Sequence, residues 1–320
     1  RFQFNTKVTA IRPENGHWVI ETNCGTFETR AVVNAAGVYA DVLHNQVSAR
    51  KLHIAPRRGD YCLLDKTTGD FAQHTVFQLP GKYGKGVLVS PTVHGNTIVG
   101  PTAIDIDDRE GTNTTAEGLN DLIEKAGATV EHLPIRQTIT SFAGLRAHED
   151  HHEFVIGEAE GAQQFIDCAG IESPGLTSSP AIGLHVSELM RDLMGLREKA
   201  HFIATRRGVL DPKTLSKEDY QQLIREKPAY GQIICRCEQV TEGEILDAIH
   251  RPLGAKSLDG VKRRTRAGMG RCQAGFCSPR VMEILARELH VGQSEITKCG
   301  GQSRLITGTN KDSIGEVQAK

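Results

Sequence analysis

The sequence contains no long apolar run and no excess of charge of either sign. No stretch approaches the roughly 20 consecutive apolar residues that a membrane-spanning helix needs, so we expect no transmembrane segment. The first residues, RFQFNTKVTA, lack the apolar core of a signal peptide. Lys and Arg number 38 and Asp and Glu number 39, which excludes a protein that coats nucleic acid through bulk positive charge. We therefore expect a cytoplasmic protein.

An initiator methionine is also missing. The chain begins at Arg1, and RFQFNTKVTAIR resembles the middle of a sheet, so we expect a fragment whose upstream portion is absent. The composition that is present, 38% hydrophobic and 24% charged, is ordinary for a globular protein. A length of 320 residues favours about two domains.

The eight cysteines fall into two classes. Four are scattered singly, and the other four form two pairs, Cys235 with Cys237 and Cys272 with Cys277, separated by 34 residues. A disulfide framework is not expected in a chain this long without a signal peptide. In a loop that curls back, both sulfurs of a C-x-C motif can face one metal centre. Four cysteines without a ligand-spaced histidine fit an iron–sulfur cluster or structural zinc.

The surroundings of these cysteines favour thiolates. Cys277 precedes a helix start at Ser278, where the positive end of the helix dipole stabilises an anion. Between residues 251 and 288 there are nine Lys and Arg residues against three acids. Glycines near Cys272 leave backbone N–H groups free to point at sulfur: Gly268, Gly270 and Gly275.

The segments CRCEQVTEGEI and RTRAGMGRCQAGFC resemble the [2Fe–2S] domain of the bacterioferritin-associated ferredoxin type. That family has the order C-x-C, a longer stretch, then C-x4-C. The resemblance implies a [2Fe–2S] cluster bound by Cys235, Cys237, Cys272 and Cys277. Structural zinc is the alternative metal, and the basic run could instead be a solvated face or a nucleic-acid patch.

The first 198 residues resemble a second family. VVNAAGVYAD is similar to the strand-plus-glycine element with which glutathione-reductase-like flavoproteins hold FAD. FAGLRAHEDHHEFVIG and AGIESPGLTSSPAIG resemble flavin-binding segments of the D-amino-acid oxidase and glycerol-3-phosphate dehydrogenase superfamily. The whole chain is similar to the FAD-containing subunits of anaerobic glycerol-3-phosphate dehydrogenases. The family's G-x-G-x-x-G fingerprint is absent, so we expect the ADP half of the site to be missing and FAD to be lost from this fragment.

The second resemblance implies a set of FAD-binding residues. Gly175 to Thr177 precede a helix, so their N–H groups and the helix dipole can face a flavin edge that becomes anionic on reduction. The complete predicted set is Val8, Ala35, Ala36, Gly37, Gly144, Ile171, Gly175, Leu176 and Thr177.

The predicted catalytic residues are Arg146 and Arg58. Arg146 in AGLR matches the superfamily arginine that binds a substrate carboxylate or phosphate, and a structural ion pair is the alternative role. Arg57 and Arg58 lie where the family's inner strand approaches the flavin. Weaker candidates for binding phosphate are Lys82 and Lys85. A general base near neutral pH would be a histidine, and five are available: His53, His74, His148, His151 and His152.

The implied function is an FAD-dependent dehydrogenase that oxidises a small anionic alcohol, with glycerol 3-phosphate favoured. Electrons would leave one at a time through the cluster to a redox partner protein or subunit, which could also bring the enzyme to a membrane surface. Gly59-Asp60-Tyr61 stands where glycerol-phosphate oxidases of the superfamily have G-S-H, which leaves a carboxylate substrate open. The alternatives are an amine or 2-hydroxy-acid oxidase, and a non-catalytic metal-binding docking module.

The predicted fold is mixed, α+β and α/β. It combines a partial FAD domain (1–49 and 143–198), an antiparallel substrate domain (50–142), a linker (199–229), a small helical four-cysteine domain (230–291) and a tail (292–320). Within it we expect a β-meander in residues 1–35 and strands at YCLLD, HTVFQLP, KGVLVSP, NTIVGPT, SFAGLR and EFVIG. We expect helices at 114–128, at 217–226, at 258–264 and at 278–289. Two further helices should begin at a cap, one at Ser178 or Ser179 with Pro180 next to it, and one at the Thr241–Glu244 capping box.

Overall fold

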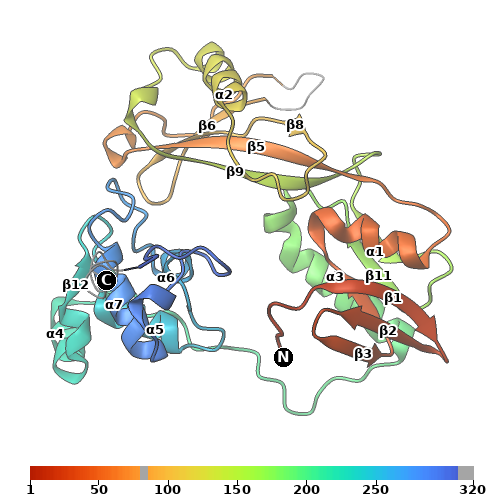
Figure 1. Ribbon diagram of the computed structural model, residues 1–320. Coiled ribbons are helices and arrows are strands. Elements are labelled where there is room, and N and C mark those ends of the chain that lie inside the picture. The colour runs from red at the N-terminus through yellow and green to blue at the C-terminus, as the bar shows by residue number, and fades with distance from the viewer. Residues whose placement is uncertain (80–85, 309–320) are drawn as a thin grey trace, which may run out of the picture. The chain divides into compact units, whose positions relative to one another are not determined.

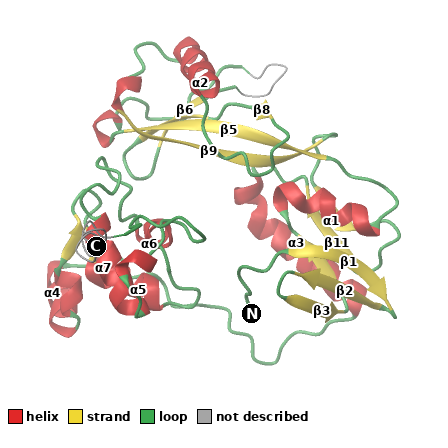
Figure 2. Cartoon of the chain, in the orientation of Figure 1, coloured by secondary structure: helices red, strands yellow, loops and turns green. Residues whose placement is uncertain are grey.

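A computed structural model describes residues 1–79 and 86–308 (Figures 1 and 2). The predicted anion-binding candidates Lys82 and Lys85 lie outside the described residues. The chain divides into two compact units, Arg1–Phe202 and Ile203–Lys320. No helix among the described residues is long and apolar enough to cross a bilayer. Besides the helices and strands given below, short 3-10 helices lie at Gly37–Tyr39, Lys66–Thr68, Ile135–Gln137, Pro212–Thr214, Pro228–Gly231 and Gln293–Glu295.

The predicted meander at the start of the chain is confirmed. Strands β1 (Val8–Glu14), β2 (His17–Thr22) and β3 (Gly25–Thr29) form an antiparallel sheet in that order. Asn15 and Gly16 join β1 to β2 with positive φ angles of 49° and 77°, as a tight hairpin turn requires. Trp18 packs against Phe165 with ring centroids 5.4 Å apart, which anchors the meander on the next sheet.

The second sheet joins distant parts of the sequence. Its order is β10 (Val155–Glu158), β11 (Phe165–Ala169) and β4 (Val32–Asn34), with β11 and β4 parallel. Helices α1 (Ala40–Val47) and α3 (Gly175–Met194) follow β4 and β11 along the chain. The ends of parallel neighbours meet at one sheet edge, so the loops after β4 and β11 leave from the same edge.

The third sheet is antiparallel and contains the longest strands. β5 (Ile54–Leu64) and β9 (Thr138–Glu149) pair along almost their whole length, and β6 (Leu88–Pro91), β7 (Thr97–Gly100) and β8 (Ile104–Asp105) complete it. Helix α2 (Ala116–Thr129) covers one face, as Figure 1 shows. The predicted strand at HTVFQLP is wrong: Val76 makes only one isolated bridge, to Val89, and Pro80 lies outside the described residues.

The second unit is small and mainly helical, as predicted. It contains β12 (Ile233–Cys235), β13 (Val240–Thr241) and helices α4 (Lys217–Glu226), α5 (Glu242–His250), α6 (Leu258–Thr265) and α7 (Ser278–Leu289). The capping box is confirmed, since the Thr241 hydroxyl accepts from the Glu244 N–H and the Glu244 carboxylate accepts from the Thr241 N–H. The fully buried side chains of Ile245, Val261 and Leu285 form its core.

This unit is larger than the predicted four-cysteine domain at both ends. On the N-terminal side α4 belongs to it, because the Tyr220 hydroxyl donates to the Tyr230 carbonyl at 2.8 Å. On the C-terminal side Ile296 is 2% exposed and packs in the core, and the Thr297 carbonyl accepts from the Leu258 N–H. The contacts of Tyr220 and Ile296 therefore make part of the predicted linker and part of the predicted tail belong to this folded unit.

Helix α3 begins before the predicted cap at Ser178 or Ser179. It starts at Gly175, which places Pro180 inside the helix. A proline there removes the N–H that would bond to the carbonyl of Leu176. The Ser179 hydroxyl donates to that carbonyl at 2.8 Å, so the helix tolerates the proline.

Candidate functional site

The four clustered cysteines come together in the second unit. Cys235 ends β12, Cys237 follows in the next turn, and Cys272 and Cys277 precede α7. All four line one cavity of about 530 Å³, and the Cys237 and Cys272 Sγ atoms are 3.7 Å apart. The two motifs, distant in sequence, therefore present four sulfurs to one space.

The hydrogen bonds around these sulfurs favour negative charge. A hydrogen bond from the Cys277 thiol, together with the backbone N–H groups of Gly268 and Glu238, lowers the pKa of Cys235 to about 5. The same pairing with Cys235 raises the pKa of Cys277.

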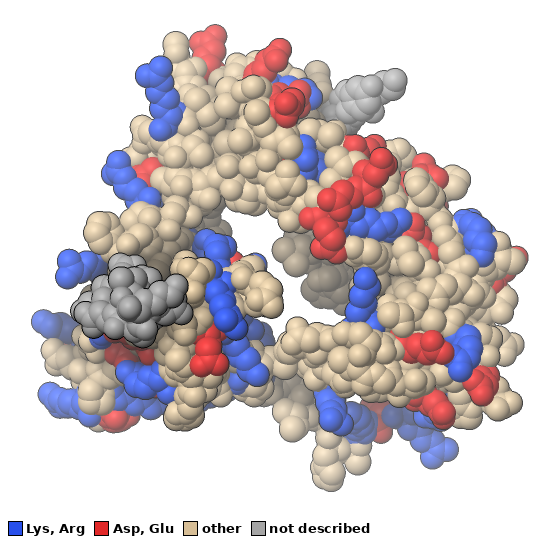
Figure 3. Space-filling view, in the orientation of Figure 1, with Lys and Arg blue, Asp and Glu red and all other residues tan. Residues whose placement is uncertain are grey.

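The local backbone fits a metal centre. A Cβ on Gly270 would lie 2.3 Å from the Cβ of Cys237, so only glycine lets the two segments approach this closely. Four thiolates with N–H donors around them are the donor set of a [2Fe–2S] cluster. Arg236 and Arg280 line the same cavity, and Phe276 beside it is 87% exposed. Figure 3 shows further Lys and Arg side chains on this unit.

A second group of candidate residues lies on the β5–β9 ladder. Residues directly opposite each other in antiparallel strands share a face, and the pairs Arg57–Arg146, Gly59–Gly144 and Tyr61–Phe142 alternate along one face. Tyr61 and Phe142 stack with centroids 5.1 Å apart. The opposite face is the one covered by α2. We call the face that α2 does not contact the Arg146 face.

Arg146 has an unsatisfied guanidinium. One Nη donates to the Thr102 carbonyl at 2.7 Å, whereas the buried Nε has no hydrogen-bond partner among the described residues. Burial lowers the pKa of this group, so its charge is incompletely compensated. A Cβ on Gly59 would lie 2.7 Å from Pro101 Cβ and 3.6 Å from the Arg146 guanidinium, whereas Gly144 faces open space. The two glycines thus leave room beside a cation.

The structure does not bring Arg58 together with Arg146. Arg58 points to the α2 side, where its Nη donates to the Thr115 hydroxyl at 3.0 Å and its Nε lies 3.4 Å from an Asp60 oxygen. Arg57 is the neighbour that shares the Arg146 face. Its guanidinium makes a two-point bond to Asp105, at 2.6 and 2.9 Å, which lowers the pKa of that carboxyl.

Of the five histidines considered as a base, His148 alone is buried and lies on the Arg146 face, two residues along β9. Its Nδ1 is 3.2 Å from the Glu172 carboxylate. Motif reasoning does not find Asp105 and Glu172. Asp105 lies on the short strand β8, and Glu172 follows a strand of a different sheet. The sequence signals that could have found them are the position of Glu172 directly after AGI and that of Asp105 directly after GPTAI. The other candidates, His53, His74, His151 and His152, are exposed.

The predicted FAD-binding residues divide into groups. Ala35, Ala36 and Gly37 follow β4, while Ile171 and the Gly175–Thr177 turn follow β11, so these two groups lie at the same sheet edge. Gly144 is on the Arg146 face. Val8 is apart from both groups, because it lies on β1 and packs against the cluster that contains Trp18.

The sheet edge fits part of a flavin dinucleotide. No side chain caps the start of α3, and Leu176 is 90% exposed, so the N–H groups of Leu176 and Thr177 are available to an anion. The Gly175 N–H, by contrast, donates to the Glu172 carbonyl. Gly37 has φ 58°, and a Cβ placed on it would have no atom within 4 Å, which leaves the backbone open to close approach. A Cβ on Gly175 would lie 2.7 Å from the Ile171 side chain, so any larger residue at the start of α3 would displace that side chain.

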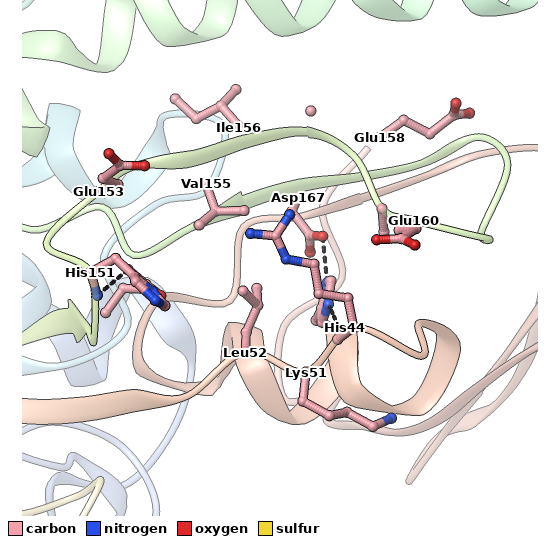
Figure 4. A pocket seen from close by; sticks show the side chains of 14 residues that line it. His44, Lys51, Leu52, His151, Glu153, Val155, Ile156, Glu158, Glu160 and Asp167 are labelled. Carbon is pink, nitrogen blue, oxygen red and sulfur yellow. Dashed lines mark hydrogen bonds and ion pairs between the residues drawn. The ribbon is translucent and has the colours of Figure 1, made fainter.

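A separate cavity of about 340 Å³ lies in the first unit, beside the buried His44–Asp167 pair (Figure 4). His44 Nδ1 and an Asp167 oxygen are 2.6 Å apart, and Asn34 donates to the other Asp167 oxygen at 2.9 Å. Of the predicted site residues that the structure describes, only His151, one of the candidate bases, lines this cavity. The hydrogen bonds of Asp167 join β11, β4 and α1, so we assign the pair a structural role.

Comparisons with known proteins agree with this two-part arrangement. The family described as DAO, FAD dependent oxidoreductase, matches residues 1–189, and the BFD-like [2Fe-2S] binding domain matches residues 233–287. A glycerol 3-phosphate dehydrogenase of Caloramator mitchellensis is 49% identical over 98% of this chain and 65% of its own length. An anaerobic glycerol-3-phosphate dehydrogenase subunit of Escherichia coli K12 is 25% identical over 82% of this chain and 54% of its own length.

Among solved structures, the FAD-bound L-alpha-glycerophosphate oxidase of Mycoplasma pneumoniae superposes with a TM-score of 0.53 at 33% identity, covering 62% of this chain and 52% of that one. The chain thus spans about half to two thirds of the relatives that it matches. Neither zinc at the four cysteines nor a chain without FAD finds support in these matches. The chain belongs to the FAD dependent oxidoreductase family and carries a BFD-like [2Fe-2S] binding domain.

Proposed function

We propose that this chain is part of an FAD-dependent dehydrogenase that oxidises glycerol 3-phosphate and passes the electrons through a [2Fe–2S] cluster to a partner. The incompletely paired guanidinium of Arg146 carries the proposal. A half-buried cation whose buried Nε donor is free, beside open space, suits the binding of an anion. The names of the relatives favour a phosphate ester over an amino or hydroxy acid.

In this proposal Arg146 binds the phosphate and Gly144 leaves the space in which the substrate lies. The charge of Arg57 is already compensated by Asp105, so Arg57 does not bind the phosphate directly. Its proposed effect is electrostatic, since, in addition to burial, its positive charge lowers the pKa of Arg146. Arg58 is a positioning residue: its contacts with Thr115 and Asp60 fix β5 beneath the site.

His148 is the proposed general base. If Nδ1 carries the ring proton, it donates to Glu172, and Nε2 is then free to accept the proton of the substrate hydroxyl. The carboxylate holds the ring orientation and stabilises the imidazolium that forms. FAD, when bound, takes up the hydride of the alcohol carbon. The residues that we propose to hold it are Ala35, Ala36, Gly37, Gly144, Ile171, Gly175, Leu176 and Thr177, with Val8 only indirectly through the meander.

The four cysteines are the proposed cluster ligands. A [2Fe–2S] cluster exchanges one electron at a time, which suits transfer to a separate redox protein. Arg236 and Arg280 at the cavity favour an acidic partner surface. None of the eight cysteines, all of which the structure describes, forms a disulfide, which supports a reducing compartment such as the cytoplasm. Attachment to a membrane would occur through that partner.

The test uses the full-length protein with both cofactors. We expect glycerol 3-phosphate to bleach the flavin absorbance anaerobically, and amino and 2-hydroxy acids to leave it unchanged. Arg146→Gln should raise KM about 100-fold, or ~2.7 kcal/mol, since the phosphate loses its charged partner. Arg191→Gln, in an exposed pair with Asp192, is the matched control.

Two results would redirect the proposal. Flavin bleaching by an amino or hydroxy acid would replace the phosphate ester by a carboxylate substrate. Zinc without iron or acid-labile sulfide, together with unchanged kinetics of Arg146→Gln, would leave the docking module instead.

A further inference from the structure

We propose that His148, His152 and Glu172 form a binding site for a zinc-like divalent ion, and that occupation of this site inactivates the proposed base. The ligand atoms of the three side chains all lie within 4.8 Å of one another. They come from β9, from the turn after it and from the loop after β11, so the fold and not local sequence brings them together.

The geometry needs little adjustment at two of the three ligands. Tetrahedral zinc with bonds of roughly 2.0–2.2 Å places its ligand atoms about 3.3 Å apart. The His148 Nδ1 and Glu172 Oε1 atoms are already 3.2 Å apart. The His148 and His152 rings are 4.3 Å apart between centroids. Two imidazoles bound to one tetrahedral zinc have centroids about 5 Å apart, so the exposed His152 ring is the one that must reorient.

The burial of the three residues suits that movement. His148 is 7% exposed and fixed in a strand, whereas His152 is exposed at the end of a turn. That turn is held by the bond from the His152 N–H to the Glu149 carbonyl, at 2.9 Å, so the backbone is set while the ring can rotate. A preformed pair plus one adaptable ligand gives a site that is open on one side.

The chemistry of the ligands selects the ion. Two imidazoles and one carboxylate favour Zn²⁺, Cu²⁺ or Ni²⁺ over Mg²⁺ and Ca²⁺, which prefer oxygen ligands alone. Three protein ligands leave a fourth position for water. The positively charged Arg57 on the same face already binds Asp105, which limits its repulsion of a cation. Arg146 interacts electrostatically with Glu172 and opposes a bound cation until an anion occupies the site.

Metal binding and base catalysis exclude each other at His148. In the proposed reaction Nδ1 carries the ring proton and Nε2 accepts the proton of the substrate. A metal bound at Nδ1 shifts the single ring proton to Nε2, with no net gain or loss of protons. Nε2 then becomes a donor and can no longer accept. This consequence rests on the proposed function, whereas metal binding itself does not.

The binding test uses full-length protein with its cluster loaded, so that the four clustered cysteines are occupied. Zinc titrated in a calorimeter should fill one site in the wild type. His152→Ala should weaken binding at least tenfold, and Glu172→Gln should do the same. His151→Ala is the matched control, because this neighbouring exposed histidine contacts Glu149 and not the proposed site, and should change the affinity less than twofold.

Zinc-edge X-ray absorption should give nitrogen and oxygen ligands at about 2.0–2.1 Å and no sulfur at about 2.3 Å. Sulfur ligands, or equal losses in His152→Ala and His151→Ala, would overturn the site. In the activity arm, zinc should inhibit glycerol 3-phosphate oxidation, with a half-inhibitory concentration at least tenfold higher in His152→Ala. Binding without inhibition would refute the link to the base. Failure to oxidise glycerol 3-phosphate would refute the proposed function and leave the binding result standing.

Discussion

In the second unit all four sulfurs come from two short segments, each beside the start of a helix or the end of a strand. In the first unit the groups around Arg146 come from β5, from β8, from β9 and from the loop after β11. Local spacing therefore specifies the cysteine site, whereas sheet register specifies the Arg146 face. A one-residue change of register would move Arg146 to the α2 side. The two sites should respond differently to substitution.

The largest expected effect is at the cysteine site. Cys235→Ser should abolish the cluster, because Cys235 is a buried proposed ligand with a lowered pKa and serine is a poor substitute for its thiolate. Iron and acid-labile sulfide analysis measures the loss. Cys299→Ser is the control, since Cys299 is exposed and does not line the cavity. Retained flavin reduction in Cys235→Ser would show that the first unit works without the cluster, and full iron content would refute the ligand assignment.

The next largest effect concerns the buried His44–Asp167 pair, which stabilises the first unit. Asp167→Ala leaves His44 and Asn34 without their buried acceptor, which should destabilise this unit by about 3–5 kcal/mol. Denaturant unfolding followed by Trp18 fluorescence reports on this unit, since Trp18 is the chain's only tryptophan. Asp192→Ala, in an exposed pair, should change little. Equal stability of the two variants would contradict the structural role of the His44–Asp167 pair.

The same contrast explains how much could be predicted from the sequence. The capping box of Thr241 and Glu244 and the helix start at Ser278 are local signals, and the structure has both where the sequence places them. Motif reasoning groups Arg58 with Arg146, but strand alternation puts Arg58 on the other face. Glu172 contacts His148 because the loop after β11, a strand of a different sheet, reaches β9. No spacing in the sequence indicates that contact.

Unexpected order at the edges of the second unit has a similar cause. Ile296 is a single apolar residue among polar neighbours, which composition assigns to a tail. It is buried because N–H groups at the start of α6 donate backbone bonds to the carbonyls of Thr297 and Lys298. Burial of an isolated side chain thus depends on a partner surface that the sequence does not reveal.

A smaller effect tests the register of the Arg146 face. In Gly59→Ala the new Cβ would contact Pro101 at 2.7 Å and crowd the Arg146 guanidinium, so we expect KM for the anionic substrate to rise about tenfold, or ~1.4 kcal/mol. Steady-state kinetics measures this. Gly127→Ala in α2 has no atom within 4 Å of the new Cβ and should leave KM unchanged while slightly stabilising the helix. Similar KM values for both variants would show that Gly59 does not shape the site.

The smallest effect is electrostatic and lies at the surface of the first unit. The hydrogen bond to Asp150 raises the pKa of His53, and His53 in turn lowers the pKa of Asp150. A histidine whose pKa is raised by folding stabilises the fold at pH values below its ordinary, unfolded-state pKa. This contribution disappears as pH rises through the folded-state pKa. Both side chains are more than half exposed, so the contribution is ~0.5 kcal/mol or less. His53→Ala should therefore lower the free energy of unfolding slightly near about pH 5.5 and not near about pH 9. Denaturant titrations at the two pH values in low salt measure the difference, and a loss of equal size at both would mean that His53 acts through packing and not through its charge.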